Sequence, residues 1–412
     1  MITPSFGLAA TERVLPKLAL DFTTASLDSR VTFTRTTGTS NPATYVASNG
    51  YITSATNNQP RFDYDPIALT CKGLLIEESR INLFTSSASP SGANTNLVTS
   101  TPTATPPDGV SASVNKIAAS AVAGGHYFQN SITVSTTTAY TWSIFVKADG
   151  ITAINLLMAQ STSPFTNHAS ISFNLTTGTV TSATVGSGTI TTYPNGWYRL
   201  TATGTSSSTG ELYRLSLLNP GSSFTGDGVS GVLVWGQQWE AGAFSTSYIP
   251  TTTTALTRNA DVATMTGTNF SDWFNAAQGT FMFQGVNYDV ASTRVMIDVT
   301  DGTLNERIQL STATNKYFMA DGGSTQANFG TGSITANAVY KIVAAYKVND
   351  LAFALNGAAT QTDNTATLPT VNQMTIGTRA VFVNSNQYSG WLQKLNYYPQ
   401  RLTNAEVQAF SK

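Results

Sequence analysis

Short runs of alternating apolar and polar residues dominate this chain. Residues 140–150, YTWSIFVKADG, place Trp142, Ile144 and Val146 on one face of an extended segment. Residues 231–242, GVLVWGQQWEAG, carry apolar side chains on both faces, which is typical of a central strand between two packed layers. Many such runs, each bounded by turn residues, predict an all-β protein made of antiparallel β-sandwiches of the jelly-roll kind.

Asn-Gly pairs mark the turns between several of these runs. The pairs at 49–50, 195–196 and 356–357 each stand beside β-favouring residues. Asn and Gly tolerate the positive φ angles that a tight hairpin turn requires, so each pair predicts a hairpin.

Helical signals are rare. The clearer one is at the C-terminus, where Thr403 is a good N-cap and Glu406 is placed to complete a capping box with it. Leu402 and Val407 have the spacing of a hydrophobic staple across that helix start. A weaker pattern at 271–277 predicts a second helix of about two turns.

Two stretches have the composition of linkers. Residues 85–108 are rich in Ser, Thr and Pro, and residues 249–260 are rich in Thr. They divide the chain into three expected parts. These are a β-rich region at 1–85 and two β-sandwiches at 86–255 and 256–412.

Composition narrows the classes of partner. Only 10% of the residues are charged, against about 25% in average soluble proteins. Mean hydropathy is −0.05 and no apolar run approaches the roughly 18 residues of a spanning helix, which argues against membrane insertion. The net charge is −1 without a basic stripe, so we expect no nucleic-acid partner. The single cysteine, Cys71, excludes an internal disulfide.

One segment departs from this sparsely charged background. Residues 59–84, QPRFDYDPIALTCKGLLIEESRINLF, mix many charges with strong apolar residues, which predicts a fixed polar junction. The residues expected to form it are Arg61, Asp63, Tyr64, Asp65, Glu77, Glu78 and Arg80.

The pattern PRFDYDP…GLLIEESR.NLF in this segment resembles one in structural proteins of tailed bacteriophages, upstream of β-rich binding modules. The runs NGWYRLTATGT and VLVWGQQWEAGAFSTSYIPT resemble carbohydrate-binding jelly rolls. The runs LAFALNGA and GWLQKLNYYPQRLTNAEVQAF resemble laminin-G or concanavalin-like sandwiches. Together these resemblances cover most of the chain.

The resemblance implies a non-enzymatic virion structural protein, either a tail-fibre or adhesin subunit or a capsid-surface fibre or decoration protein. Residues 1–85 would then dock to other virion proteins, and the seven junction residues would be the assembly residues. The sandwiches would face a host-surface glycan, in a homo-oligomer of which a trimer is the favoured form. The N-terminus lacks the pattern of a secretory signal, which suits a protein made in the host cytoplasm and carried in the virion.

Glycan binding requires aromatic faces on which a sugar ring can stack, beside polar groups that bind its hydroxyls. Trp197, Tyr198, Trp239 and Trp273 are the residues we predict for this role. Further candidates lie in similar runs, although a buried aromatic is the default inside a strand. They are Trp142, Trp235, Tyr388 and Trp391.

Candidate catalytic and metal-binding residues are few. His126 and His168 lie far apart, no metal-ligand spacing or G-x-S-x-G motif is present, and no catalytic residue or cofactor is predicted. Calcium is a minor alternative at the pairs 63/65 and 298/301, since carboxylates are its usual ligands.

Two alternative functions remain open. The first is a polysaccharide depolymerase or glycosidase, which needs a pair of carboxylates about 5–10 Å apart. Its candidate residues are Glu77, Glu78, Asp298 and Asp301. The second is a lectin-like protein on a cell surface, against which the missing signal sequence argues.

Overall fold

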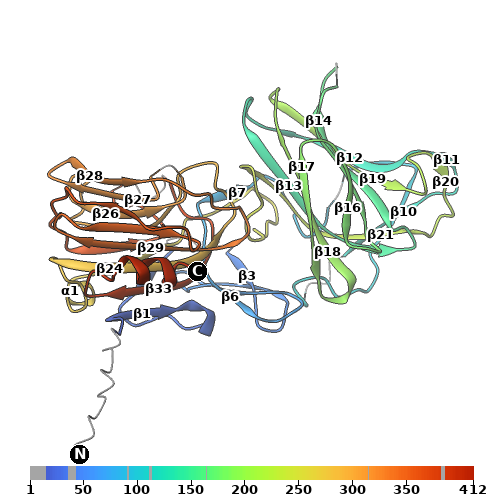
Figure 1. Cartoon of the computed structure of the whole chain (residues 1–412). Coiled ribbons are helices and arrows are strands. Elements are labelled where there is room, and N and C mark those ends of the chain that lie inside the picture. The colour runs from blue at the N-terminus through green and yellow to red at the C-terminus, as the bar shows by residue number, and fades with distance from the viewer. Residues whose placement is uncertain are drawn as a thin grey trace, which may run out of the picture.

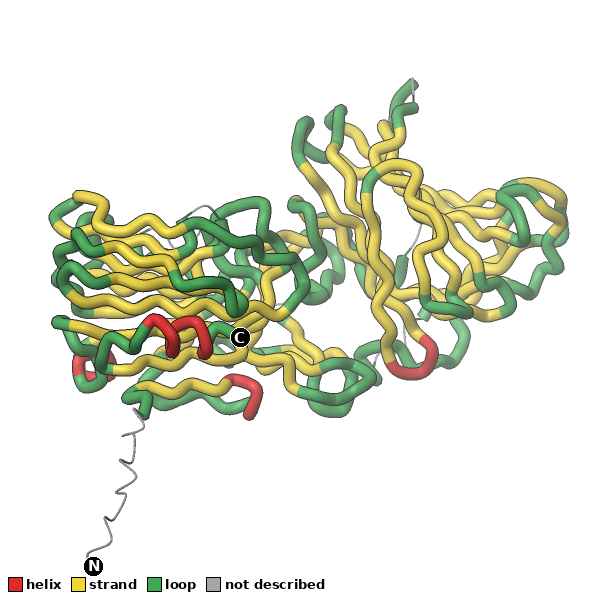
Figure 2. Tube along the Cα trace, viewed as in Figure 1, coloured by secondary structure: helices red, strands yellow, loops and turns green. Residues whose placement is uncertain are grey.

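The computed structural model describes residues 15–35, 43–90, 92–110, 114–163, 165–313, 315–381 and 386–412. Two β-sandwiches lie next to each other, joined by blue N-terminal strands and intervening loops (Figure 1). Strands far outnumber helices along the trace (Figure 2). The predicted all-β class is therefore confirmed.

The middle sandwich consists of two six-stranded sheets. The first sheet runs in the order β17 (Ser187–Tyr193), β18 (Trp197–Thr205), β13 (Ala139–Asp149), β21 (Gly231–Ala241), β10 (Asn115–Ala119) and β9 (Leu97–Ser100). The second runs in the order β16 (Thr179–Val185), β15 (Asn167–Asn174), β14 (Ala153–Gln160), β19 (Gly210–Leu218), β12 (His126–Thr133) and β8 (Ala93–Thr95). A small pair, β11 (Ala123–Gly124) and β20 (Phe224–Thr225), extends one end.

Both faces of the first sheet are covered, as the apolar pattern of β21 predicts. Trp142, Ile144 and Val146 of β13 point into the core between the two sheets. Phe145 and Trp235 point the other way and pack under the hairpin of β3 (Thr44–Val46) and β4 (Ile52–Ser54). The hairpin is part of the N-terminal region, so this region already contacts the middle sandwich.

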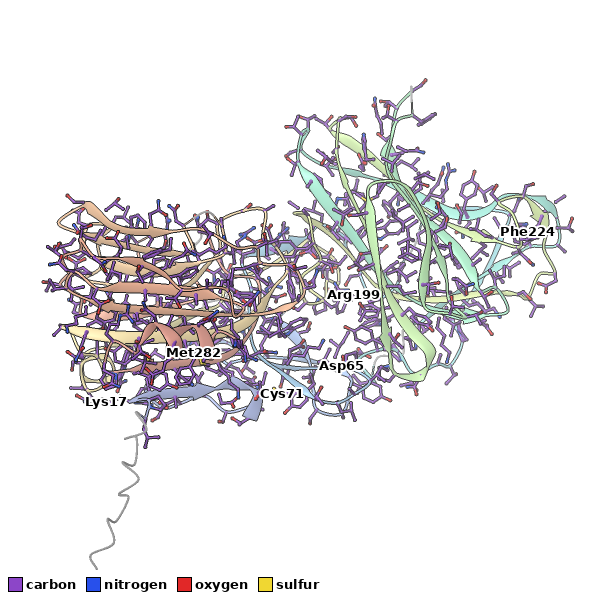
Figure 3. The ribbon with its side chains drawn as sticks, in the orientation of Figure 1. Lys17, Asp65, Cys71, Arg199, Phe224 and Met282 are labelled. Carbon is purple, nitrogen blue, oxygen red and sulfur yellow. The ribbon has the colours of Figure 1, made fainter. Side chains whose placement is uncertain are left out.

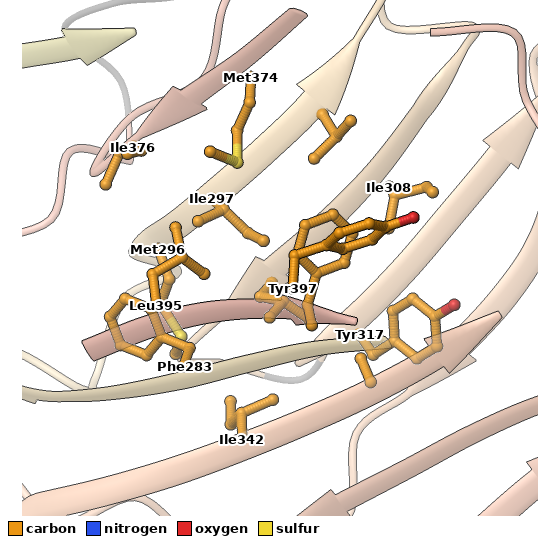
Figure 4. Close-up of a cluster of buried hydrophobic side chains, with 14 of the residues drawn as sticks. Phe283, Met296, Ile297, Ile308, Tyr317, Ile342, Met374, Ile376, Leu395 and Tyr397 are labelled. Atoms are coloured by element: carbon orange, nitrogen blue, oxygen red, sulfur yellow. The ribbon is translucent and has the colours of Figure 1, made fainter. Parts of the chain in front are cut away.

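The C-terminal sandwich pairs an eight-stranded with a seven-stranded sheet. The first follows the order β31 (Gln361–Asp363), β30 (Leu351–Leu355), β29 (Val339–Lys347), β24 (Gln278–Asn287), β33 (Gly390–Tyr398), β6 (Cys71–Ile76) and β5 (Phe62–Tyr64), with β1 (Leu18–Asp21) also on β33. The second follows the order β2 (Thr32–Thr34), β23 (Val262–Thr266), β32 (Gln373–Ile376), β25 (Val295–Thr300), β26 (Arg307–Ser311), β27 (Tyr317–Asp321) and β28 (Ser324–Phe329). Large apolar side chains such as Phe283, Ile297 and Leu395 fill the space between them (Figure 4).

The N-terminal region is built into this C-terminal sandwich, which differs from the predicted division into three parts. Strands β1, β5 and β6 extend its eight-stranded sheet, and β2 pairs with β23 of the other sheet. Another pair joins β7 (Arg80–Asn82) to β22 (Leu256–Arg258). The physical reason is burial, because Leu18, Leu20, Leu74 and Ile76 find their apolar partners only in the core of that sandwich.

Both predicted linkers contain strands. Residues 85–108 contain β8 and β9, which form one edge strand in each sheet of the middle sandwich, and 249–260 contains β22. Their Ser- and Thr-rich composition suits exposed edge strands as well as linkers, so composition alone did not distinguish the two.

The C-terminal helix is confirmed as α2 (Asn404–Phe410). The Thr403 amide donates to Glu406 Oε2 at 2.8 Å and the Glu406 amide donates to Thr403 Oγ1 at 3.3 Å, which is the predicted capping box. Leu402 and Val407 are buried in one cluster. The second helix, α1, covers Thr268–Ser271 and ends where the sequence predicted its start.

The Asn-Gly turns form as predicted, with one difference. Asn195 and Asn356 adopt positive φ angles of 61° and 49° in tight turns before β18 and after β30. The turn at 49–50 joins β3 to β4 but is longer, since β3 ends at Val46 and β4 begins at Ile52. Short 3₁₀ turns lie at η1 (Phe22–Thr24) and η2 (Pro194–Gly196). In the part of the chain that the structure describes, no helix has the length and apolarity to cross a membrane.

Candidate functional site

A buried network of charged side chains lies where the two sandwiches meet. Arg61 bridges Glu77 at 2.8 Å and also pairs with Asp261. Arg35 bridges Asp261 at 2.9 Å, and Arg258 bridges Glu77 at 2.9 Å. All five side chains are 0% exposed, so each charge depends on its partners rather than on water.

The network holds Glu77 in its ionised form. Burial alone would raise the pKa of Glu77, but the charges of Arg258 and Arg61 and two hydrogen bonds from Ser247 lower it to about 2. The amide and hydroxyl of Ser247 each donate to this carboxylate at 2.7 Å. Arg61, Arg258 and the Ser247 hydroxyl all contact Oε2, the Ser247 amide donates to Oε1, and a carboxylate with so low a pKa has no proton to give at neutral pH.

The network joins the parts of the chain that meet at the junction. Arg61 and Glu77 come from the N-terminal region, and Ser247 from the segment that leaves the middle sandwich. Arg258 and Asp261 come from the start of the C-terminal sandwich. The ion pairs therefore join the N-terminal region to the C-terminal sandwich, and the two hydrogen bonds from Ser247 to Glu77 connect the end of the middle sandwich to this network.

Next to the network, a cleft of about 590 Å³ opens between the two sandwiches. We call it the interdomain cleft. Strands β17 and β18 line it on the middle sandwich, and the hairpin β3–β4, strands β5 and β6, and residues 243–248 line it at the junction. Tyr288 and Trp391 line it from the C-terminal sandwich. In Figure 3, Arg199 lies on the side of the middle sandwich that faces the junction.

Trp391 is the main aromatic group of the cleft. Its ring is half-buried, and its Nε1–H donates to Asp63 Oδ2 at 2.9 Å. Lys72 Nζ lies 4.5 Å from the ring centroid, and Tyr288 packs edge-on against Trp391 at 5.0 Å. Asp63 also accepts a hydrogen bond from the Val46 amide at 2.7 Å. These contacts fix the orientation of the indole at the cleft surface.

Burial raises the pKa of Asp63, although the charge of Lys72 and the hydrogen bonds from Val46 and Trp391 oppose that shift. The Asp63 carboxylate lies 3.9 Å from the Lys72 ammonium. The cleft therefore offers one cation, one partly desolvated acid and one oriented indole close together.

Hydroxyl groups cover the opposite wall of the cleft. Thr189, Thr191, Thr201 and Thr203 line it from β17 and β18, and the Thr189 and Thr201 hydroxyls lie 2.8 Å apart. Arg199 lies among them and donates to Ser143 Oγ at 2.9 Å. Hydroxyls can both donate and accept, so this wall suits a ligand that carries many hydroxyls.

The structure corrects three of the four predicted glycan-binding residues. Trp197, Trp239 and Trp273 are 0%, 0% and 1% exposed, so none can stack on a sugar, and that prediction is wrong. Trp239 fills the core of the middle sandwich. The indole N–H of Trp197 donates to the Thr105 carbonyl, and that of Trp273 to the Asn269 carbonyl, both at 2.8 Å.

Tyr198, the fourth, is half-buried on β18 and packs against the core of the middle sandwich. It does not belong to the residues that line the interdomain cleft. The half-buried aromatic side chains that line the cleft are Tyr45, Phe244, Tyr288 and Trp391, and of these the sequence offered only Trp391, as a further candidate. Trp391 is the second residue of β33, between the buried residues Gly390 and Leu392.

The predicted junction residues separate into three groups. Arg61 and Glu77 belong to the buried network, and Asp63 belongs to the cleft. The other four have different surroundings. Tyr64 packs beside the hairpin β3–β4. Asp65 accepts hydrogen bonds from the amides of Ile67 and Ala68. Glu78 pairs with Arg80 at 2.5 Å and with Arg294 at 2.7 Å.

The carboxylates considered for glycosidase chemistry or calcium do not share one site. Asp298 is buried and accepts from the Ala380 amide at 3.2 Å, whereas Asp301 accepts from the Thr303 amide at 2.8 Å in a turn. Among the described residues, no group of three or more His, Cys, Asp and Glu is arranged to hold a metal ion.

Comparison with known proteins gives no family for the chain. No protein-family model matches it. No curated protein matches its sequence either.

Solved structures match parts of the fold. The carbohydrate-binding module CBM40 of a Ruminococcus gnavus sialidase matches with 12% identity over 35% of this chain and 88% of that one, with a TM-score of 0.31. Domain 4 of the arabinanase AbnA from Geobacillus stearothermophilus matches with 12% identity over 37% of this chain and 73% of that domain, with a TM-score of 0.29. The K499G mutant of the NanB sialidase from Streptococcus pneumoniae matches with 11% identity over 35% of this chain and 26% of that one, with a TM-score of 0.28. Similarity this low carries no argument about what this chain binds.

Proposed function

We propose that this chain is a virion structural protein of a tailed bacteriophage that binds a host-surface glycan in the interdomain cleft. The single observation that carries the binding role is Trp391, an oriented indole at the surface of a cleft whose opposite wall is lined with hydroxyls. The phage origin rests on the resemblance of residues 59–84. The cleft itself acts by binding and leaves the glycosidic bonds of its ligand intact.

The chemistry of the cleft fits a sugar. The apolar face of a pyranose stacks on an indole, and the ring hydroxyls then point toward the polar groups around it. Thr189 and Thr191 are exposed on the facing wall, and the Lys72 ammonium, which lies over one face of the indole, adds a donor. The buried charge network keeps both walls in place, so little conformational entropy is lost when a ligand binds.

Assembly into a homo-oligomer, a trimer in the favoured form, is the second part of this proposal. Strand β16 (Thr179–Val185) is an edge strand, carries no charged residue and is exposed at all seven positions. Uncharged exposed edges invite pairing with other chains, and a specific subunit contact covers them. Analytical ultracentrifugation of the purified chain tests this part, and a monomer at micromolar concentration contradicts it.

A glycan array tests the binding role. The full chain, Trp391→Ala and a control variant, Tyr127→Ala, are labelled and applied to bacterial surface glycans. Tyr127 is a matched control because it is also a half-buried ring under a cation, Arg214 at 4.2 Å, but lies on β12 of the other sheet. We expect a glycan signal that the control keeps and Trp391→Ala loses.

One observation favours glycoside cleavage as a second candidate function. Asp63 and Glu77 both line the cleft and their pKa values are shifted in opposite directions, as in an acid and base pair. Against it, Glu77 is fully buried between Arg61 and Arg258. Release of reducing ends from a bound polysaccharide, abolished in Asp63→Asn, would favour this candidate over binding alone.

A further inference from the structure

Three side chains of the middle sandwich form a hydrogen-bonded line that no binding role requires. The Ser207 hydroxyl lies 2.7 Å from His168 Nε2, and His168 Nδ1 contacts Glu211 Oε1. Ser207 is exposed, whereas His168 and Glu211 are 7% and 1% exposed. Ser207 follows β18, His168 lies on β15 and Glu211 lies on β19, so the fold brings together residues from separate strands.

The order of these contacts sets the protonation of the imidazole. An ionised carboxylate can only accept hydrogen bonds, so His168 Nδ1 carries the proton that Glu211 accepts. In the neutral ring, Nε2 then has a free lone pair directed at the Ser207 hydroxyl. This is the arrangement of a nucleophile, a general base and an orienting acid.

The line is held in place by its surroundings. A Cβ atom at Gly204 would lie 2.2 Å from the His168 carbonyl oxygen, and one at Gly186 would lie 2.9 Å from it. These two glycines therefore allow β15 to approach the opposite sheet closely. The Ser206 hydroxyl lies 2.7 Å from the Ser208 carbonyl oxygen and 3.1 Å from the second carboxylate oxygen of Glu211, so its one proton is shared between these two acceptors.

We propose that Ser207 is a nucleophile that removes small acyl groups from esters, with His168 as its base and Glu211 as a positioning residue. Ser207 Oγ adds to the ester carbonyl carbon while its proton passes to His168 Nε2. The bond from that carbon to the alcohol oxygen breaks, and the proton passes from His168 to this oxygen. Water, activated by His168, then hydrolyses the acyl-serine to release the acid and restore the hydroxyl.

The substrate class, an acyl ester on a sugar hydroxyl, rests on the proposed glycan-binding function. Ser207 follows the cleft residue Thr203 by four residues, which is at most about 14 Å of extended chain. A glycan in the interdomain cleft therefore needs to extend only a short way along β18 to present an ester to Ser207. We expect a small acyl group such as acetyl, because Ser207 is exposed to solvent.

Labelling with a fluorophosphonate probe tests the nucleophile separately from glycan binding. The full chain is treated with the probe, and the labelled residue is identified by mass spectrometry. We expect one label per chain, on Ser207. Ser207→Ala abolishes it, His168→Gln slows it by about 100-fold or more, and Ser182→Ala, an exposed serine on β16 without a histidine partner, leaves it unchanged.

Glu211→Gln gives a readout that a structural role alone would not change. The amide can donate to Nδ1 and place the proton on Nε2, so we expect slow labelling with a changed pH profile, and partial rescue in Glu211→Asp. Circular dichroism shows whether each variant is folded, and the exposed Ser207→Ala decides the result if a His168 variant unfolds. No label on Ser207 in the folded chain overturns the proposal, as does labelling at the wild-type rate in folded His168→Gln.

Release of acetate from an acetylated glycan by the wild type, lost in Ser207→Ala, then supports the substrate class. Labelling without acetate release would reject that class and leave the nucleophile standing.

Discussion

Arg61 and Glu77 form an ion pair of 2.8 Å in which both side chains are completely buried. Each also has a second charged partner, Asp261 for Arg61 and Arg258 for Glu77. Buried charges are stable only while every partner is present, because water cannot replace a lost one. This network therefore holds the N-terminal region on the C-terminal sandwich, and these two parts form one side of the interdomain cleft.

Glu77→Gln leaves Arg61 and Arg258 without their shared carboxylate. We expect the free energy of unfolding to fall by about 3–5 kcal/mol, as when one partner of a buried pair is removed. Urea denaturation followed by circular dichroism measures the loss. As a control, Asp149→Asn breaks a partly exposed pair with Lys116 and should cost less than about 1 kcal/mol. Equal losses in the two variants would contradict the account of the network.

Acid should weaken the chain through the same residue. The pKa of Glu77 falls from 4.5 to about 2 on folding, so its stabilisation is present above about pH 4.5 and is lost as the pH falls toward 2. The difference corresponds to a contribution on the order of 3 kcal/mol. Urea midpoints at pH 5, 3.5 and 2.5 measure it, and Glu77→Gln should show a smaller decrease than the wild type over this range. A parallel decrease in both proteins would assign the acid sensitivity to other carboxylates.

Removal of the N-terminal region should unfold the C-terminal sandwich. A fragment of residues 86–412 lacks β1, β5 and β6 from the eight-stranded sheet and β2 from the other, together with apolar side chains such as Leu18 and Ile76. We expect limited proteolysis to degrade residues 256–412 in this fragment and to spare them in the full chain. A fragment with a folded, protease-resistant C-terminal sandwich would mean that this sandwich folds without the N-terminal strands.

Thr403→Ala removes the N-cap of α2. The Glu406 amide then loses its acceptor, and such a loss costs about 1 kcal/mol in typical helices. Hydrogen exchange should accelerate in α2 by several fold and stay unchanged in β21. Thr365→Ala, another exposed threonine, is a suitable comparison because it lies in a loop outside α2.

The sequence predicted the local structure better than the arrangement of the chain. Alternation placed Trp142 and Ile144 correctly in a core, and the capping box at Thr403 formed as expected. The role of the N-terminal strands could not be predicted in this way. A run such as Cys71–Ile76 shows that a strand is buried, but not which distant strand, here β33, will pair with it.

The candidate site was hard to predict for a related reason. Trp197 and Trp391 both stand in strand-like runs, and only the tertiary fold decides which indole is buried. The line of Ser207, His168 and Glu211 carries no local motif, since its histidine lies on β15 and its serine in the loop between β18 and β19. In contrast, the charge density of residues 59–84 pointed to the region where the network and part of the cleft lie.

The most direct test of the central claim is the affinity of the full chain for a surface polysaccharide selected on the glycan array, measured by isothermal titration calorimetry. Truncation of Trp391 removes the stacking surface but leaves the cation and the hydroxyl wall. We predict that Trp391→Ala binds about 5-fold or more weakly than the wild type, since the loss of a stacked aromatic group costs at least about 1 kcal/mol. Tyr127→Ala should bind like the wild type. An unchanged dissociation constant for folded Trp391→Ala would contradict the claim that the interdomain cleft is the glycan-binding site.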